Sequence, residues 1–221
     1  MRLIVGITGA TGAPFGVRVL ELLRDHPDVE THLVMSRWAR TTIELETPYT
    51  AREVAKLADV HHGSGDQAAS ISSGSFRTAG MIIAPCSMKT LAGIRTGYAD
   101  GLIGRAADVV LKERRKLVLV PRETPLSEIH LENMLALTRM GAVMVPPMPA
   151  FYNHPQCIGD IIDHVAMRVL DQFGMEAPVH TPRWSGLADA AHHAPFAASP
   201  TAHRLRRESA HAATTAAEGG R

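Results

Sequence analysis

The sequence predicts a single α/β domain in which a doubly wound, mostly parallel β-sheet lies between two layers of helices. Three observations predict it: apolar runs too short to be helices, segments of helical periodicity between them, and the alternation of the two along residues 1–186. Runs that are apolar throughout are typical of strands buried on both faces. Helices that connect such strands pack on both sides of the sheet, which gives a three-layer arrangement of the Rossmann or flavodoxin type.

Five short apolar runs are predicted to be strands. None is long enough for an ordinary helix, and β-branched and aliphatic residues dominate each of them. They occupy residues 2–8, 30–36, 81–85, 116–121 and 141–146.

Six stretches of helical periodicity lie between and after these strands. The last has its apolar residues on one side, with Pro155 before it and Gly174 after it, as helix boundaries often have. Thr124 is predicted to cap the fifth, with Pro125 as its first residue. The predicted helices cover residues 15–24, 38–45, 88–96, 102–115, 126–140 and 158–173.

The composition is that of one ordinary globular domain and argues against several classes of partner. Lys and Arg number 23 against 22 Asp and Glu, so no broad cationic face is available for nucleic acid. The longest stretch without a charged side chain, residues 141–159, contains four prolines and cannot be a membrane-spanning helix. Because no secretory signal pattern opens the chain, we expect a cytoplasmic protein with reduced thiols.

Residues 187–221 differ from the rest of the chain in composition. They contain 12 alanines and four histidines but only three large apolar side chains, Leu187, Phe196 and Leu205. Such a segment buries too little apolar surface to offset the entropy of ordering it. We therefore expect a disordered tail after a domain that spans residues 1–186.

A glycine-rich loop follows the first predicted strand. Gly6, Gly9, Gly12 and Gly16 surround the turn into the first helix, where free amides favour a phosphate group. A tight turn without a ligand is the alternative. A nicotinamide-dependent dehydrogenase is disfavoured, because Ser36 follows the second strand where a ribose-binding acid is expected, and the spacing departs from G-x-G-x-x-G.

The third predicted strand leads into the sequence P-C-S-M-K-T. Ser87 and Thr90 place hydroxyls beside the amides of another helix start, which predicts a second anion site. Cys86 and Cys157 are interpreted as small buried thiols, since no histidine stands in a recognisable partner motif. No Cys/His metal site is expected, because His61-His62 and His192-His193 lie in a loop or the tail with no matching ligand pair.

Charged residues follow the fourth strand and occupy the helix before it. Arg122 can bind a phosphate through two parallel hydrogen bonds from its guanidinium. Glu123 either complements a helix dipole or acts as a general acid/base. Arg105, Asp108 and Lys112 share one helical stripe, for which a solvated charged face is the default interpretation.

Aromatic residues follow the fifth strand and recur near residue 184. Tyr152 in the sequence A-F-Y-N-H-P could donate its hydroxyl to a phosphate. Trp184 is either a packed anchor for the tail or an aromatic lid over the site.

Taken together, these motifs resemble the flavin prenyltransferase family, the UbiX-type and phenylacrylic-acid-decarboxylase-type proteins. The resemblance covers residues 1–186 and is closest to the branch that accompanies hydroxyarylic or phenolic acid decarboxylases. The motifs stand in family order: G-I-T-G-A-T-G, S-R-W-A, I-E-L-E-T, S-S-G-S-F, P-C-S-M-K-T-L-A-G-I, R-A-A-D-V-V-L-K-E-R-R, L-V-L-V-P-R-E-T-P-L, H-L-E-N-M and P-A-F-Y-N-H-P.

The resemblance implies a metal-independent transferase. Such an enzyme joins the dimethylallyl group of dimethylallyl monophosphate to N5 and C6 of reduced FMN, and the prenylated FMN serves a separate UbiD-type decarboxylase. Family members commonly form homododecamers with sites at subunit junctions, so Lys112 and Arg168 could act in a neighbour's site.

The resemblance also implies roles for individual residues. One departure is Thr11, which stands where many members have serine. The residues expected to bind FMN are Gly9, Ala10, Thr11, Ser36, Ser87, Met88, Lys89, Thr90 and Arg122. Those expected to bind the prenyl phosphate are Tyr152, Arg168, Lys112, Arg105 and Trp184, and those expected in catalysis are Glu123, Glu46, Thr11 and Lys112.

Two other functions remain open from the sequence. One is a flavin-dependent decarboxylase of the related cysteine-decarboxylase superfamily, and the other is a flavin-binding decarboxylase subunit without catalysis. Tyr152, Arg168 and Lys112 argue against both, because neither function needs a second phosphate site.

Overall fold

The computed structural model describes residues 1–176, 183, 184 and 186. It divides into two compact units, of which the first comprises Met1–Pro149 with Ile158–Thr181 and the second Ala150–Cys157 with Pro182–Arg221. The predicted tail, residues 187–221, lies outside the described residues.

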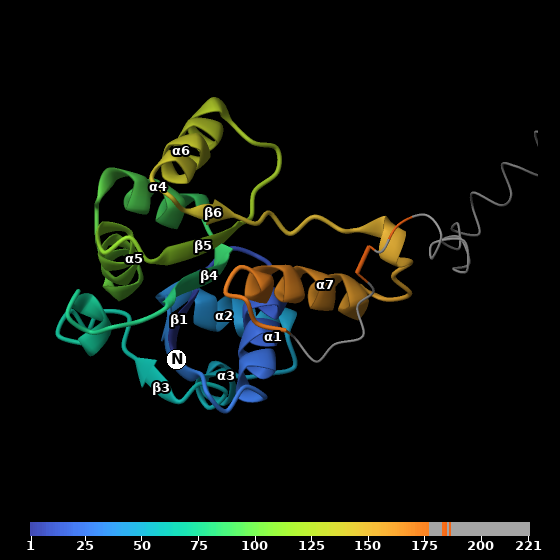
Figure 1. Ribbon diagram of the computed structural model, residues 1–221, viewed down its shortest axis with the longest axis horizontal. Coiled ribbons are helices and arrows are strands. Elements are labelled where there is room, and N and C mark those ends of the chain that lie inside the picture. Colours follow the sequence, from blue (N-terminus) through green and yellow to red (C-terminus); the bar gives the residue numbers. More distant parts are fainter. Residues whose placement is uncertain (177–182, 185, 187–221) are drawn as a thin grey trace, which may run out of the picture. The chain divides into compact units, whose positions relative to one another are not determined.

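A six-stranded parallel sheet forms the centre of the first unit, in the order β3-β2-β1-β4-β5-β6 (Figure 1). The predicted α/β class with a parallel sheet is therefore confirmed. The strands are β1 (Arg2–Ile7), β2 (Glu30–Met35), β3 (Val60–His62), β4 (Gly80–Cys86), β5 (Lys116–Pro121) and β6 (Val143–Met144). β6 is shorter than predicted, and β3 was not predicted because it is a three-residue edge strand without an apolar run.

The helices confirm the predicted alternation of strand and helix. They are α1 (Ala13–Arg24), α2 (Arg37–Glu46), α3 (Ala51–Ala55), α4 (Met88–Thr96), α5 (Leu102–Lys112), α6 (Glu128–Arg139) and α7 (Ile158–Asp171), with 3₁₀ turns η1 (Ser70–Ser72) and η2 (Phe151–Asn153). The predicted helix over 102–115 ends early, because Arg114 adopts a left-handed backbone with φ of 56°. α3 was not predicted, although Thr50 and Glu53 form a capping box at its start.

The predicted cap of the helix after β5 is wrong. α6 begins beyond Thr124 and Pro125, and its N-cap is Ser127, whose hydroxyl accepts a hydrogen bond from the amide of His130. The His130 side chain accepts in turn from the amide of Ser127 at 3.2 Å. This reciprocal pair satisfies two helix-end donors, which a cap at Thr124 would leave unpaired.

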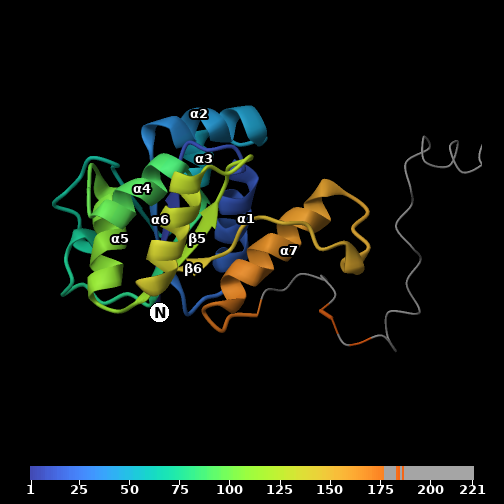
Figure 2. The same cartoon turned by 90° about the horizontal axis from the view of Figure 1, so that it is seen from above.

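Alternate residues of the central strands enter two separate cores. Leu3, Val5 and Ile7 of β1 pack with α1 and α7 on one face, whereas Ile4 packs with α4, α5 and α6 on the other. The two groups of helices lie on opposite sides of the strands (Figure 1, Figure 2). This arrangement is the predicted three-layer fold, and its ligand-binding edge is the one where the parallel strands end.

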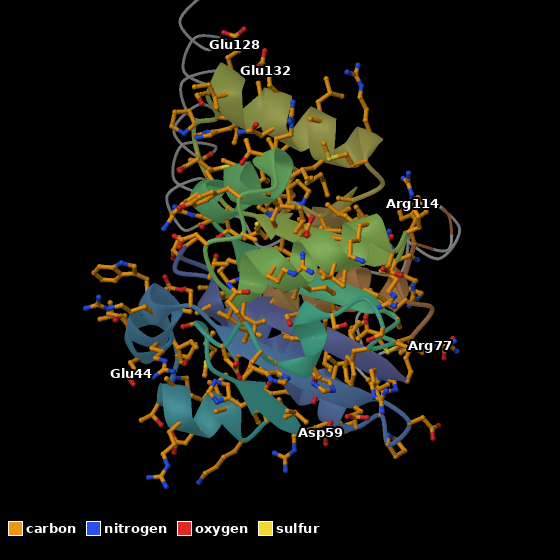
Figure 3. The ribbon with its side chains drawn as sticks, turned by 90° about the vertical axis from the view of Figure 1, so that its left-hand side faces the viewer. Glu44, Asp59, Arg77, Arg114, Glu128 and Glu132 are labelled. Carbon is orange, nitrogen blue, oxygen red and sulfur yellow. The ribbon has the colours of Figure 1, made fainter. Side chains whose placement is uncertain are left out.

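Charged side chains cover the outside of these layers. Glu44 on α2 and Glu128 and Glu132 on α6 are exposed and point away from the ribbon (Figure 3). Within the described residues, no helix has both the length and the apolar character that crossing a membrane requires.

Two histidines form a hydrogen-bonded pair between β2 and β3. His32 Nδ1 lies 2.9 Å from His62 Nε2, the rings stack, and His32 Nε2 lies 3.1 Å from Glu30 Oε1. If His32 donates to Glu30, its Nδ1 lone pair accepts the His62 N–H, so the neutral pair satisfies both contacts. Burial and the neighbouring His32 lower the pKa of His62.

The lowered pKa of His62 should make the fold less stable in mild acid. The unfolded chain takes up a proton near pH 6.5, whereas folded His62 resists it, so the free energy of unfolding should fall as pH drops from 7 to 5. Urea titrations across this range will measure the slope, and His62→Gln should reduce it. Burial also lowers the pKa values of His61 and His164, so part of the slope should remain. An unchanged slope in His62→Gln would contradict this assignment.

Candidate functional site

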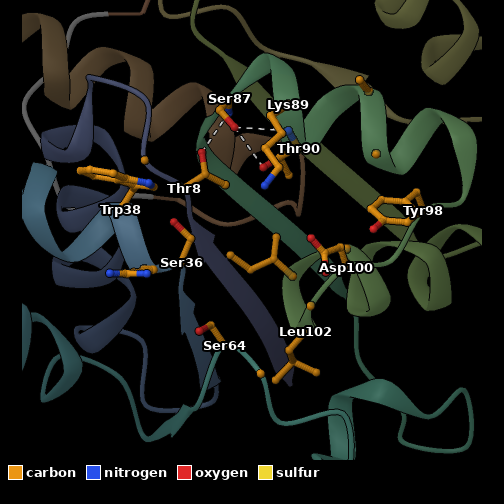
Figure 4. Close-up of a pocket in the computed structure, with 18 of the residues that line it drawn as sticks. Thr8, Ser36, Trp38, Ser64, Ser87, Lys89, Thr90, Tyr98, Asp100 and Leu102 are labelled. Carbon is orange, nitrogen blue, oxygen red and sulfur yellow. Dashed lines mark hydrogen bonds between the residues drawn. The ribbon is translucent and has the colours of Figure 1, made fainter.

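A cavity of about 690 Å³ opens at the edge where β1, β2 and β4 end (Figure 4). Thr8, Ser36 and Ser87 are the residues that directly follow these three strands, and all three line it. Ligands of doubly wound sheets bind at such an edge, beyond the carboxyl ends of the strands. The predicted site edge and the observed cavity therefore coincide.

Thr8 joins the ends of the two central strands. Its hydroxyl donates to the carbonyl of Pro85 at 2.7 Å and accepts from the amide of Ser87 at 2.9 Å, and the residue is only 1% exposed. Sequence reasoning did not single out Thr8. Its position directly after a buried strand, beside the glycine loop, was the available signal.

The start of α4 provides an anion-binding end of the cavity. The Ser87 hydroxyl caps the helix by accepting from the amide of Thr90 at 3.3 Å, and it donates to the Thr90 hydroxyl at 3.0 Å. The first two helical residues, Met88 and Lys89, have amides without an intrahelical acceptor. Together with the Lys89 side chain, these amides favour a negatively charged group.

The remaining cavity lining is largely apolar. Trp38, Ala92, Leu102 and Ile103 contribute to it. A Cβ at Gly9 would lie 2.3 Å from the Cβ of Trp38, so only glycine permits this approach of the first loop to α2. A cavity of this size with one anionic-group site and apolar walls fits a phosphorylated aromatic ligand such as FMN.

The anion at the start of α1 is a protein carboxylate. Glu46 Oε2 accepts from the amides of Gly12 and Ala13 at 2.8 and 2.9 Å. The expectation that these amides bind a ligand phosphate is therefore corrected, because the side chain of Glu46 already satisfies them. Ser36 caps α2, from which Glu46 projects, by accepting from the amide of Ala39 at 3.1 Å.

The cavity unites part of the predicted flavin-binding set. Gly9, Ser36, Ser87, Lys89 and Thr90 line it, whereas Ala10, Thr11, Met88 and Arg122 belong to adjoining segments without lining it. The amide of Arg122 nevertheless donates to the carbonyl of Cys86 at 3.2 Å, which places the end of β5 beside that of β4. Tyr98, Asp100 and Ser64 also line the cavity and carried no signal in the sequence.

Glu123 lies exposed between β5 and α6. Its carboxylate accepts from the amide of Thr124 at 3.0 Å. Because α6 begins only after its Ser127 cap, Glu123 is outside the first turn, and its interpretation as a dipole complement is wrong. The role as an acid/base group stays a prediction.

Lys112 and Arg105 do not line the cavity. Lys112 is the last residue of α5, about 15 Å along the helix axis from Leu102, which does line it. Its ammonium pairs with Glu113. Arg105 pairs with Asp108 at 2.8 Å and donates to the carbonyl of Ser72 at 3.0 Å, which indicates a structural role for its side chain.

Arg168 lines a second, smaller cavity of about 290 Å³. The cavity lies between α7 and the segment that begins with β6, and Val143, Val145 and Met148 supply much of its surface. Arg168 Nη1 lies 2.6 Å from the carboxylate of Asp171.

Tyr152 and Trp184 are neighbours within the second unit. Their ring centroids are 5.6 Å apart at an interplanar angle of 77°, an edge-to-face arrangement. Both rings remain about half exposed, 47% for Tyr152 and 54% for Trp184. The prediction that Tyr152 contacts a phosphate is not tested by this contact.

The two cysteines differ from each other. Burial raises the pKa of Cys86 to about 12, so it is the inert buried thiol that was predicted. Cys157 is exposed, and its predicted burial is wrong, because it lies in the turn before α7 and not in a core. Within the described part of the chain, no three His, Cys, Asp or Glu side chains cluster as metal ligands would.

Comparison with known proteins identifies the family of this fold and cavity. The model of the family described as Flavoprotein matches residues 1–170. A probable UbiX-like flavin prenyltransferase from Escherichia coli is 75% identical over 190 residues, which are 86% of this chain and 96% of the relative. The chain belongs to the UbiX-like flavin prenyltransferase family.

Two solved structures extend the comparison of this UbiX-like chain. A dodecameric FMN-dependent UbiX-like decarboxylase from Escherichia coli O157:H7 is 75% identical, with a TM-score of 0.82, over 85% of this chain and all of that one. AnUbiX (PadA1), solved in complex with FMN and dimethylallyl pyrophosphate, is 57% identical with a TM-score of 0.82, over 84% of this chain and 97% of that one. The resemblance recognised in the sequence is therefore confirmed.

Replacing Thr8 by valine should disturb the cavity without changing its shape. The part-buried amide of Ser87 would lose its acceptor, which costs on the order of 1 kcal/mol of stability. We expect a melting temperature lower by several degrees and weaker FMN binding, measured by thermal denaturation and flavin fluorescence titration. Thr8→Ser keeps the hydroxyl and is the matched control. Equal FMN affinity in Thr8→Val and the wild type would contradict the role given to Thr8.

Proposed function

We propose that this UbiX-like flavin prenyltransferase joins the dimethylallyl group of dimethylallyl monophosphate to N5 and C6 of reduced FMN. The observation that carries this proposal is the large cavity at the strand ends. The start of α4 gives it donors for an anion, and apolar side chains form much of the rest of its wall. The similarity to a protein solved with both FMN and dimethylallyl pyrophosphate supports the two substrates. We assign the activity to residues 1–186.

Residues of the cavity hold FMN in this proposal. Ser36, Ser87, Lys89 and Thr90 offer hydroxyl, amide and ammonium donors to its phosphate and polar groups. Trp38 and Ile103 supply apolar surface for the aromatic ring. Reduced FMN, when bound, supplies the nucleophilic atoms of the reaction.

Departure of the allylic phosphate needs positive charge and hydrogen-bond donors. Lys112, Arg168 and Tyr152 provide these groups in our proposal, as side chains that stabilise the charge of the leaving group. Lys112 is about 15 Å along α5 from the cavity of its own chain, so we assign it to the site of a neighbouring subunit. The dodecameric relative supports such an assembly, and we propose a homododecamer here.

Metal ions are not required by this arrangement. Prenyl-transfer enzymes that bind diphosphates through magnesium carry paired aspartates, whereas this sequence contains no two consecutive aspartates. Arginine, lysine and tyrosine donors suit a monophosphate without a bridging ion.

Ring closure requires an acceptor for the C6 proton and delivery of one proton to the prenyl double bond, while the proton of N5 leaves with the released phosphate. Glu123 is our candidate base, because its exposed carboxylate follows β5 at the same edge of the sheet as Ser87. Glu46 adds a second carboxylate, held in place by the amides of Gly12 and Ala13. Thr11 directly precedes Gly12 in the same loop, and we assign its hydroxyl to the catalytic site as well.

We propose that the product, prenylated FMN, passes to a UbiD-type decarboxylase. The chain then makes a cofactor and does not decarboxylate a substrate itself. Cys86 is a buried thiol, which is consistent with a reducing compartment, and we propose the cytoplasm as the location of the protein.

Anaerobic incubation of the protein with reduced FMN and dimethylallyl monophosphate tests the function. Mass spectrometry should show a flavin that has gained one prenyl unit, with magnesium absent and EDTA present. Parallel reactions with dimethylallyl diphosphate establish which leaving group is used. A flavin of unchanged mass would end the proposal. Carbon dioxide released from an aromatic or cysteine-containing acid by this protein alone would favour the decarboxylase alternative.

Glu123→Gln should separate flavin binding from turnover. The amide keeps the size of the side chain but cannot accept the C6 proton, so FMN should bind as in the wild type while product formation falls by a factor of about 10² or more. Flavin fluorescence and single-turnover mass spectrometry measure the two effects. Glu128→Gln, an exposed change on α6, is the control. Full activity in Glu123→Gln would remove this carboxylate from the mechanism.

Mixed oligomers should reveal whether Lys112 acts across a subunit boundary. Lys112→Ala alone should slow transfer by a factor of about 10² to 10³, as the loss of one charge-stabilising donor does. A bulky change in the cavity, Gly9→Val, should abolish FMN binding. Assemblies refolded from both variants should regain activity. In them, the intact cavity of a Lys112→Ala subunit can lie beside the intact Lys112 of a Gly9→Val subunit. No recovery in verified mixed oligomers would place Lys112 in its own chain's site or outside any site.

A further inference from the structure

Arg168 and Asp171 form an ion pair one turn apart near the end of α7. Arg168 Nη1 lies 2.6 Å from Asp171 Oδ2, a short charge-assisted hydrogen bond. The two side chains differ in exposure, at 51% for Arg168 and 13% for Asp171. The carboxylate is thus the more fixed of the two partners.

The two side chains also differ in what they face. Arg168 lines the 290 Å³ cavity beside the segment that follows β6, whereas Asp171 does not. The carboxylate therefore holds the guanidinium without adding negative charge to the surface of the cavity. Only Nη1 bonds to Asp171, and the Nε and Nη2 hydrogens of the planar guanidinium remain oriented for a second acceptor.

Stability alone gives little reason for this pair. An ion pair with a half-exposed arginine contributes little to the free energy of folding. Its main effect is on the conformation of Arg168, because a long side chain without a fixed partner populates many rotamers and must lose that freedom when it binds a ligand.

We infer that Asp171 is a positioning residue, which holds the guanidinium of Arg168 ready to receive the phosphate of the prenyl substrate. This inference rests on the proposed function, in which Arg168 binds that phosphate. Asp171 itself touches neither substrate, so its contribution is to the orientation of its partner.

His164 lies one turn before Arg168 and lines the same cavity. Burial, with a smaller contribution from the Arg168 charge, lowers the pKa of His164, whereas Asp171 opposes the shift. The lowered pKa favours the neutral form of His164, whereas Arg168 keeps its charge and lines the same cavity.

Steady-state kinetics of Asp171→Asn in the assembled, FMN-loaded enzyme tests the inference. The KM for dimethylallyl monophosphate should rise about tenfold, the change that loss of one charge-assisted hydrogen bond of the partner produces, and kcat should fall as well, because the same guanidinium stabilises the charge of the leaving phosphate. The Kd for FMN should stay at its wild-type value. Asp171→Glu, which retains a carboxylate, should recover most of the affinity for the prenyl phosphate.

Two further variants make the result specific. Asp163→Asn also removes an ion pair from α7, the one with Arg18 at 2.5 Å, and should leave the KM for the prenyl phosphate unchanged. In an Arg168→Ala background, Asp171→Asn should have no additional effect on KM, because a residue that acts only through Arg168 has nothing left to orient.

The outcomes separate this inference from the proposed function. A wild-type enzyme that forms no prenylated FMN would refute the function before any variant is compared. An active wild type whose KM is unchanged in Asp171→Asn would overturn the positioning role alone. The same holds if Asp171→Asn raises KM equally with and without Arg168, or if KM for the prenyl phosphate and Kd for FMN rise together with a loss of melting temperature.

Discussion

The hydrogen bonds of the Thr8 hydroxyl are the constraint on which the cavity depends. β1 and β4 are neighbours in the middle of the sheet, and each ends at the edge where the cavity opens. Thr8 accepts from the amide of Ser87 and donates to the carbonyl of Pro85. The start of α4, with its cap and the first amides that have no acceptor within the helix, is thereby fixed relative to the glycine loop. In the proposed function the FMN phosphate therefore meets donors that are already oriented, which reduces the entropy cost of binding.

Two of the helices that begin at this edge, α1 and α4, use the same electrostatic property differently. Both N-termini carry a partial positive charge. At α1 that charge is neutralised by Glu46 from within the chain, so the glycine loop serves to position a carboxylate. At α4 the cap comes from Ser87, which is uncharged, and the terminus can still attract an anion. One helix start thus orients an acidic side chain, and the other is suited to a ligand.

The sequence predicts the fold well because the apolar patterns of the central strands are continuous and their helices strongly periodic. Every strand buried on both faces was predicted, and the missed β3 is an edge strand with two histidines. Only some of the residues that line the cavity could be predicted. Ser36 and Ser87 were predictable because each directly follows a predicted strand, whereas Tyr98 and Asp100 lie in a loop that has no periodic pattern. Glu46 could be placed near the site only by resemblance, because no local pattern shows that its carboxylate reaches the amides of Gly12.

In the proposed mechanism the positions of the basic residues link activity to assembly. Lys112 and Arg168 both lie in the last turn of their helices, where a cation complements the helix dipole, and each has an acidic partner close in sequence, Glu113 or Asp171. A single fold can hold such a cation in place, but α5 carries Lys112 away from the cavity that its own first residues line. In the proposed mechanism Lys112 therefore acts on a leaving phosphate in another copy of the chain, and a separated subunit would retain a flavin cavity and lack part of the group-transfer site. With Lys112 supplied by a neighbouring subunit, the subunit interface is part of the mechanism. The contacts that hold the subunits together also set the distance between the flavin and the Lys112 ammonium.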